Sequence, residues 1–170
     1  MKTSLAFLLS LVMMLVVSGC GGIGEEEANR NRDGAKWVIQ QGGSVQLTDL
    51  TSEFKSVDAL PETPFTVARV NLNRTKVTDK DLEKLQDLKS LEVLGLHSTN
   101  VTDKGMDTIA NLESLKELDL SNTRITDKGL EKLSRLKNLE KLFVSQTGVT
   151  AEGVESLQAK LSDCKIIHIP

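Results

Sequence analysis

The chain is poor in the residues from which catalytic and metal sites are usually built. Its 170 residues include no Tyr, one Trp, two His and two Cys. Neither His97 nor His168 lies in a known catalytic motif. The sequence also contains no glycine-rich phosphate loop, no Cys/His metal spacing and no Gly-x-Ser-x-Gly. These absences argue against an enzyme, and we expect no cofactor and no metal ion.

An excess of basic residues is also missing. Lys and Arg number 21 against 24 Asp and Glu, which gives a formal net charge of −3 at pH 7. A mildly acidic surface without a basic cluster does not attract phosphate backbones, so we expect no nucleic-acid partner.

The chain does contain an internal repeat. Val-Thr-Asp-Lys begins at Val77 and at Val101, Ile-Thr-Asp-Lys begins at Ile125, and a divergent copy begins at Val149, so the step is 24 residues each time. A strict period of this length is typical of a solenoid of stacked supersecondary units. Because solenoids usually act by presenting a surface, we look for function on a face of the molecule.

Apolar residues recur at fixed positions within the 24-residue unit. In the third unit, Leu118 and Leu120 alternate with polar residues, as in a short strand with one buried face. Leu130, Leu133 and Leu136 then follow at three-residue spacing, which keeps them on one face of a helix. Each unit therefore predicts a strand, a turn, a helix and a return.

These patterns resemble a leucine-rich repeat. The stretch from Leu115 to Leu133 reads Leu-x-x-Leu-x-Leu-x-x-Thr-x-Ile-Thr-Asp-x-Gly-Leu-x-x-Leu. Its second half resembles the subclass called cysteine-containing, with Thr where that subclass has Cys. The resemblance covers about residues 67–170 in four consecutive units. It implies an α/β solenoid with a parallel concave sheet, outer helices and right-handed crossovers.

Two polar columns within the repeats call for a structural explanation. Thr75, Thr99, Thr123 and Thr147 follow the strands, and we expect their hydroxyls to bond backbone groups in the turn. Asp79, Asp103 and Asp127 each follow a Thr near an expected helix start, where the Thr or the Asp side chain accepts free N–H groups and the carboxylate suits the helix dipole. We predict helix caps here rather than a stacked cation site, since Ala151 breaks the Asp column.

The first twenty residues resemble the signal sequence of a bacterial lipoprotein. A basic start, Met1-Lys2, precedes an apolar run at 5–17 that is too short for a comfortable membrane span. The following Val17-Ser18-Gly19-Cys20 resembles the lipobox. The resemblance implies removal of residues 1–19 and attachment of two or three acyl chains to Cys20, enough for a stable anchor. An ordinary signal peptide with an incidental Cys is the alternative.

The segment before the repeats divides into a tether and a cap. Residues 20–34 are rich in Gly and charge and predict a flexible tether, although part of 25–31 could be helical. Residues 35–66 predict a helix, a strand at 44–47 and an irregular segment. We interpret Trp37, Val38 and Ile39 as covering the open end of the first repeat. Insertion of Trp37 into a membrane interface is an alternative. Residues 48–64 do not fit the period and either seal the sheet edge or carry function.

The C-terminal end departs from the pattern. Lys160 stands where the preceding unit has Leu136, and Leu161 is apolar instead, so the last strand, at 164–169, could be shifted by one residue. The sequence leaves open whether Ile166 or Ile167 is buried. Cys164 has no disulfide partner once Cys20 carries lipid, and we interpret it as a small buried apolar residue.

The strand residues that alternate with the buried ladders define a candidate binding surface on the concave side. Its members are Arg69, Asn71, Asn73, Arg74, His97, Glu117, Asp119, Ser121, Asn122, Lys141, Phe143 and Ser145. Most are polar and vary from unit to unit, whereas the buried ladders are uniform. The exception, Phe143, either packs against the terminal strand or forms a binding hot spot.

The two resemblances together imply a lipid-anchored, non-catalytic protein-interaction module of the bacterial cell envelope. In a cell with an outer membrane, Gly21 after the lipidated Cys resembles the sequence sorted to that membrane, facing the periplasm or the cell surface. A glycan-binding protein and a structural spacer are the alternatives. Sugar sites usually stack an aromatic ring, and this face offers only Phe143, which favours a protein partner.

Overall fold

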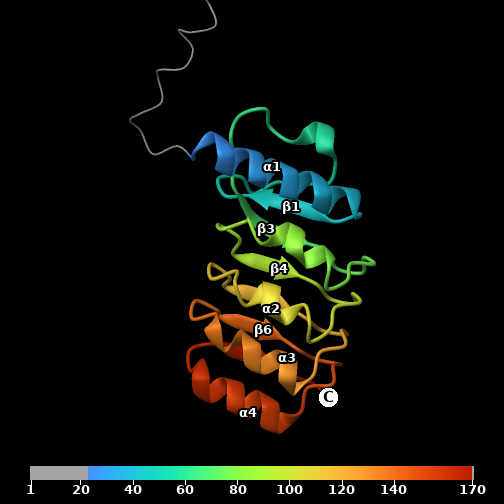
Figure 1. Cartoon of the computed structure of the whole chain (residues 1–170), viewed down its shortest axis with the longest axis vertical. Helices are drawn as coiled ribbons and strands as arrows, with labels where there is room; N and C mark the ends of the chain where they lie inside the picture. The colour runs from blue at the N-terminus through green and yellow to red at the C-terminus, as the bar shows by residue number, and fades with distance from the viewer. Residues whose placement is uncertain (1–22, 170) are drawn as a thin grey trace, which may run out of the picture.

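The computed structural model describes residues 23–169. Its repeats form one layer of strands and one layer of short helices, stacked along the long axis of the molecule (Figure 1). The sheet has seven strands in the order β2-β1-β3-β4-β5-β6-β7. The proposed signal peptide and Cys20 lie outside the described residues.

Five parallel strands carry the repeats. They are β3 (Val67–Asn71), β4 (Val93–Gly95), β5 (Glu117–Asp119), β6 (Lys141–Phe143) and β7 (Lys165–Ile167). Each strand pairs with residues one repeat further on: Leu94 lies opposite Leu118, and Leu118 lies opposite Leu142. This register confirms the predicted α/β leucine-rich-repeat solenoid with a parallel sheet.

The helical layer is shorter than the sequence pattern predicts. It consists of the 3-10 helix η2 (Asp81–Leu85), α2 (Met106–Ile109), α3 (Asp127–Lys132), the 3-10 helix η3 (Leu133–Arg135) and α4 (Ala151–Lys160). A 24-residue unit leaves few residues for a helix between the turn after one strand and the start of the next strand. Helical segments this short often form i→i+3 hydrogen bonds and are 3-10 helices. The predicted ladder residues Leu118, Leu130 and Leu133 are nevertheless fully buried between the two layers.

The Thr column behaves as predicted. The hydroxyls of Thr75, Thr99 and Thr147 each donate to the carbonyl oxygen three residues earlier, at 2.7 Å. Thr123 makes the equivalent bond to Leu120. These bonds pair strand-end carbonyls in the turns.

The Asp column does not cap its own helices, which corrects our prediction. Asp103 Oδ1 accepts from Thr126 N at 2.7 Å, and Asp103 Oδ2 accepts from the Thr126 hydroxyl at 2.7 Å, so the carboxylate binds the next unit. Asp79 and Asp127 make the same pair of bonds to Thr102 and Thr150. The side chains of Thr126 and Thr150 are the helix caps, since they accept from backbone N–H groups of α3 and α4. The Asp column therefore links neighbouring repeats.

The N-terminal region contains a long helix where we predicted a tether. Helix α1 runs from Glu25 to Gln40, and Asn31 and Gly34 within it are buried. Asn31 Oδ1 accepts from Val67 N at 2.8 Å, which pairs the first N–H group of β3. Arg32 donates to the Pro61 carbonyl oxygen at 2.6 Å. The cap thus begins at Glu25. The structure adopts the helical alternative for residues 25–31, and the tether prediction is wrong for residues 32–34, because these tertiary contacts stabilise a helix that composition alone does not predict.

The rest of the cap completes the N-terminal edge of the sheet. Strand β1 (Ser44–Leu47) pairs antiparallel with β3, and β2 (Glu53–Phe54) pairs antiparallel with β1. A 3-10 turn, η1 (Val57–Ala59), follows. Val38 is buried, and Trp37 and Ile39 pack against the core, as residues that cover the end of the first repeat would do. Among the described helices, none is long and apolar enough to cross a membrane.

The last strand stays in register. Leu142 pairs with Ile166, again one repeat apart, and Ile166 is the residue that packs against the core. The one-residue shift suggested by the sequence is confined to the return before β7. There Leu161 and Cys164 are buried, each one residue after the position that its ladder predicts. Burial raises the pKa of the Cys164 thiol to about 11, in agreement with its interpretation as an apolar residue.

Candidate binding surface

The sheet side opposite the helices is called the open sheet face below. The twelve candidate residues lie on it or in the turns directly after its strands. The exposed members are Arg69, Asn71, Asn73, Arg74, Asn122 and Lys141, and the half-buried members are His97, Glu117, Asp119, Ser121, Phe143 and Ser145. Strand pairing places Glu117 between Val93 and Lys141, and Asp119 between Gly95 and Phe143. The structure therefore brings the candidates together on one surface.

The turn after each strand has a left-handed residue at one fixed position. Arg74, Ser98, Asn122 and Gln146 have φ between 54° and 60°. This conformation is uncommon outside Gly, Asn and Asp, and it persists only where the surrounding structure enforces it. Here the turn is enforced by strand-like bonds between units, such as Arg74 N to His97 O at 2.7 Å. The side chains at these positions consequently border the open sheet face at regular intervals.

Hydrogen bonds within and between units fix several polar side chains of the face. His97 Nε2 lies 2.9 Å from Ser98 Oγ, and Asn122 Nδ2 donates to the same oxygen at 2.8 Å. Asp119 Oδ1 accepts from Ser121 N at 2.9 Å. The face is therefore preorganised, which lowers the entropy cost of binding.

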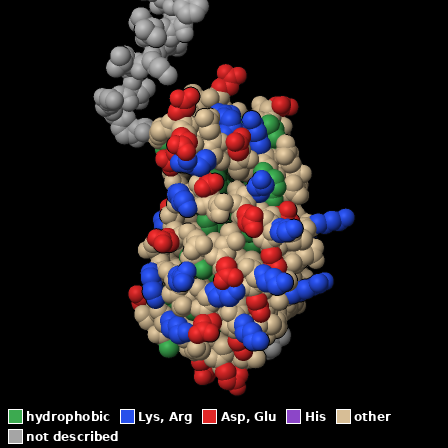
Figure 2. Space-filling view, viewed as in Figure 1, with side chains coloured by type: hydrophobic (Ala, Val, Ile, Leu, Met, Phe, Trp, Pro, Cys, Tyr) green, Lys and Arg blue, Asp and Glu red, His purple; other side chains and the backbone are tan. Residues whose placement is uncertain are grey.

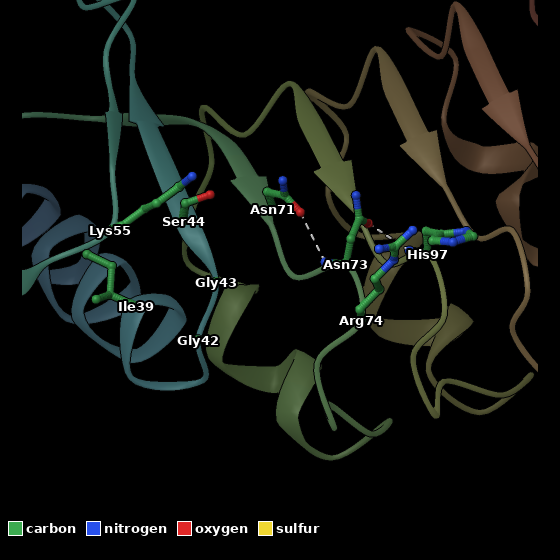
Figure 3. Close-up of a pocket in the computed structure, with 9 residues that line it drawn as sticks. All are labelled: Ile39, Gly42, Gly43, Ser44, Lys55, Asn71, Asn73, Arg74 and His97. Atoms are coloured by element: carbon green, nitrogen blue, oxygen red, sulfur yellow. Dashed lines mark hydrogen bonds between the residues drawn. The ribbon is translucent and has the colours of Figure 1, made fainter.

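A hollow of about 450 Å³, here called the N-terminal cleft, lies where the cap meets the first two repeats. It is lined by Ile39, Gly42, Gly43, Ser44, Lys55, Asn71, Asn73, Arg74 and His97 (Figure 3). A neighbouring hollow of about 260 Å³ continues from β1 to β5 and shares Ser44, Asn71 and Asn73 with the first. Both of these hollows include residues from the N-terminal end of the open sheet face.

Two asparagines shape the N-terminal cleft. Asn71 Oδ1 accepts from Asn73 N at 3.0 Å, and Asn73 Oδ1 accepts from His97 N at 2.8 Å. Both amide oxygens are thereby assigned to backbone donors, and both amide nitrogens point away from those donors (Figure 3). A Cβ atom on residue 95 would lie 2.8 Å from Asn73 Oδ1, so Gly95 leaves room for this side chain.

The cap contributes residues that the sequence analysis missed. Ser44 Oγ donates to Glu53 Oε1 at 2.5 Å, and Lys55 Nζ lies 3.0 Å from Glu53 Oε2. The pKa of Glu53 is lowered, chiefly by the Ser44 hydroxyl and then by Lys55. These residues lie in or beside the aperiodic segment 48–64, where no repeat column shows which side chains face the sheet. Within residues 23–169, no three His, Cys, Asp or Glu side chains are grouped as metal ligands.

Comparison with known proteins agrees with this architecture. Residues 89–149 match the family model described as leucine rich repeat. An internalin from Listeria monocytogenes is 21% identical over 81% of this chain and 35% of its own, with a TM-score of 0.51. A leucine-rich repeat protein of Leptospira interrogans is 24% identical over 50% of this chain and 21% of its own, with a TM-score of 0.40.

The ectodomain of the receptor kinase SOBIR1 from Arabidopsis thaliana is 14% identical over 83% of this chain and 92% of its own, with a TM-score of 0.46. The chain covers only about a third of the internalin and a fifth of the Leptospira protein. No curated protein matches it. The chain thus has the leucine-rich repeat fold, and domains of this fold are generally protein-interaction modules.

Proposed function

We propose that the protein is a membrane-anchored, non-catalytic interaction module of the bacterial cell envelope, and that the open sheet face binds a protein partner. The observation that carries this proposal is the contrast between the two sides of each strand. The buried position of β4, β5 and β6 is Leu each time, whereas the flanking positions that face outward vary, as in Val93, Glu117 and Lys141. Packing in the core accounts for the uniform Leu positions. It does not require the variable outward positions, and we therefore assign these to recognition of a partner.

Two residues in the middle and C-terminal part of the face are suited to test this. Asp119 and Phe143 are cross-strand neighbours, and Phe143 also neighbours Ile167. An apolar ring among polar side chains is a typical binding hot spot. We expect Asp119→Ala and Phe143→Ala to weaken capture of the cross-linked partner from native membranes at least fivefold, without a comparable loss of thermal stability.

The matched control lies on the helical layer. Lys128 in α3 is exposed, and its side chain forms no hydrogen bond or ion pair with the described residues, so Lys128→Ala should leave capture intact. Lys132 is less suitable, because its Nζ lies 2.8 Å from Asp107 Oδ2 and 2.9 Å from the Asp103 carbonyl oxygen in the preceding unit. Loss of capture in Lys128→Ala but not in the face variants would assign binding to the helical side.

The anchoring part of the proposal rests on the lipobox-like sequence ending at Cys20. Because α1 begins at Glu25, the five residue steps from Cys20 could span at most about 18 Å when fully extended. Helix α1 lies at one end of the long axis, so an anchored molecule would hold its cap close to the bilayer and its repeats further away (Figure 1).

Intact mass and detergent partitioning of the mature protein test the anchor. We expect the wild-type chain to carry acyl chains on Cys20 and to enter the detergent phase, whereas Cys20→Ser should do neither. A mature N-terminus at any other residue, without acyl mass, would contradict the anchor and leave the interaction surface untouched. In a cell with an outer membrane, we place the protein on that membrane.

A further inference from the structure

The N-terminal cleft differs in charge from the protein that surrounds it. The chain as a whole carries a formal net charge of −3. Yet Lys55 and Arg74 line the cleft, and no Asp or Glu does. The neighbouring hollow is different, since Arg69 is accompanied there by Glu53, Glu117 and Asp119. The cleft is therefore the one of the two hollows that suits an anionic group.

Hydrogen-bond donors in the cleft are arranged to complement this charge. The oxygens of Asn71 and Asn73 accept from backbone N–H groups, so their Nδ2 groups remain as donors; the Asn71 side chain also hydrogen-bonds Glu53 and helps to lower its pKa, whereas Asn73 has no such carboxylate partner among the described residues. Arg74 forms no ion pair with any described residue, and its guanidinium lies beside Asn73 and His97 (Figure 3). Lys55 is held at the rim by its exposed ion pair with Glu53. The Glu53 carboxylate lies against Ser44 and Lys55, so the part of the cleft that suits an oxyanion is the one beside Arg74 and Asn73, where it would meet a charged and a neutral donor.

We propose that the N-terminal cleft binds the carboxylate side chains of an acidic peptide segment in the protein partner. This inference rests on the proposed function and names the chemistry of one end of its surface. A peptide fits better than a free ion because the cleft shares Ser44, Asn71 and Asn73 with the hollow that continues to β5. An extended segment could thus place an acidic residue at Arg74 and continue along the open sheet face.

A selection from a random-peptide display library on the full-length chain in detergent tests the proposal. We expect the selected peptides to be enriched in Asp and Glu relative to the unselected library. Replacing their acidic residues by Asn and Gln should weaken binding at least tenfold. Selected peptides without an acidic excess, or failure to select any peptide, would overturn the proposal.

Variants of the cleft identify where the peptides bind. Arg74→Gln removes the unpaired charge, and Asn73→Asp keeps an oxygen for His97 N while adding a negative charge. Each should weaken peptide binding about tenfold or more. Arg124→Gln makes the same charge change at an exposed residue outside the cleft and should change binding less than twofold.

Control measurements distinguish acidic-peptide binding in the N-terminal cleft from the proposed function of the whole open sheet face. Circular dichroism should show unchanged folding for all three variants. If Arg74→Gln and Arg124→Gln weakened peptide binding equally, the peptides would be attracted non-specifically by positive charge, and the assignment of binding to the cleft would be overturned. If partner capture still depends on Asp119 and Phe143 while acidic peptides ignore the cleft, this inference fails and the proposed function stands.

The helical side of the molecule differs from the cleft, because acidic and basic side chains are interspersed over that whole face (Figure 2). Among the described residues, exposed ion pairs join neighbouring units, as in Lys116 with Glu92 at 2.8 Å and Lys160 with Glu131 at 3.1 Å. Arg74, like Arg124 and Lys128, belongs to no such pair, but of these three only Arg74 lines the cleft.

Discussion

At the scale of single residues, one glycine column shows how neighbouring repeats constrain each other. Gly105, Gly129 and Gly153 each lie against the Asp of the preceding unit. A Cβ atom on residue 105 would come within 2.6 Å of Asp79 Oδ1. In the first unit the equivalent residue is Asp81, whose carboxylate accepts from Thr78 N at 2.8 Å. Glycine is therefore required where a carboxylate arrives from the preceding repeat, and this explains the Gly in the repeat pattern.

A double-mutant cycle tests this explanation. Gly129→Ala should destabilise the fold by about 1–3 kcal/mol, because its Cβ would meet the carboxylate and the backbone of Asp103. Asp103→Ala alone should also destabilise, because it removes two bonds to Thr126. In the double variant part of the clash disappears, so we expect a coupling of more than about 0.5 kcal/mol from urea unfolding. Strict additivity would mean that the glycine serves another purpose.

The buried thiol of Cys164 gives a second residue-scale prediction. With a pKa of about 11, roughly one thiol in a thousand is ionised at pH 8, against about a quarter for a free thiol of pKa 8.5. In the Cys20→Ser chain, Cys164 should react with a disulfide reagent at least about 100-fold more slowly when folded than in denaturant. The direction is fixed by burial: the neutral thiol is favoured in the fold, so this contribution to stability is lost as pH rises from about 9 toward 11. Rapid reaction of the folded protein at pH 8 would show that the C-terminal return is open.

At the scale of elements, helix α1 is the part of the fold that departs most from the sequence-based expectation. Its buried Asn31 bridges two elements, since Oδ1 accepts from Val67 N and Nδ2 donates to the Glu27 carbonyl oxygen at 2.9 Å. Arg32 adds a contact over the Phe65 ring, 4.9 Å from its centroid. These contacts make α1 part of the cap.

A pair of asparagine variants distinguishes a cap from a tether. Asn31→Ala should cost about 1–3 kcal/mol, because it leaves the Val67 N–H buried without a partner. Asn29→Ala, two residues away and exposed, should cost less than about 0.5 kcal/mol. Thermal or urea unfolding of both variants provides the measurement. If both variants lost equally little unfolding free energy, residues 25–34 would not be part of the cap and would act as a tether.

The sequence predicted the repeated elements and also the strand at 44–47, but it did not show which side chains of the aperiodic cap face the sheet. The strand ladders, the Thr bonds and the buried Leu118 follow from a 24-residue period that each unit restates. The direction of the Asp bonds could not be read in the same way, because period alone does not tell a cap from a link to the next unit. The cleft residues Ser44 and Lys55 come from the aperiodic cap, and only tertiary pairing of β1 with β2 and β3 places them.

At the scale of the whole molecule, the open sheet face is asymmetric. Its N-terminal end holds the cleft with Arg74 and the two asparagines, and its C-terminal end holds the apolar neighbours Phe143 and Ile167. Strands β3 and β6 are three spacings apart, or about 14 Å at roughly 4.8 Å per strand. Under the proposed function, one extended partner segment could reach both ends, with an acidic residue at one and an apolar residue at the other.

Photo-cross-linking from defined positions tests the central claim, recognition through the open sheet face, most directly. A benzophenone side chain would replace Ser121 or Lys141 on the open sheet face, or Lys128 or Glu155 on the helical layer, with irradiation in native membranes. The account predicts adducts of discrete mass from the first pair and none from the second. Adducts confined to Lys128 and Glu155 would contradict it, because the partner would then contact the helices.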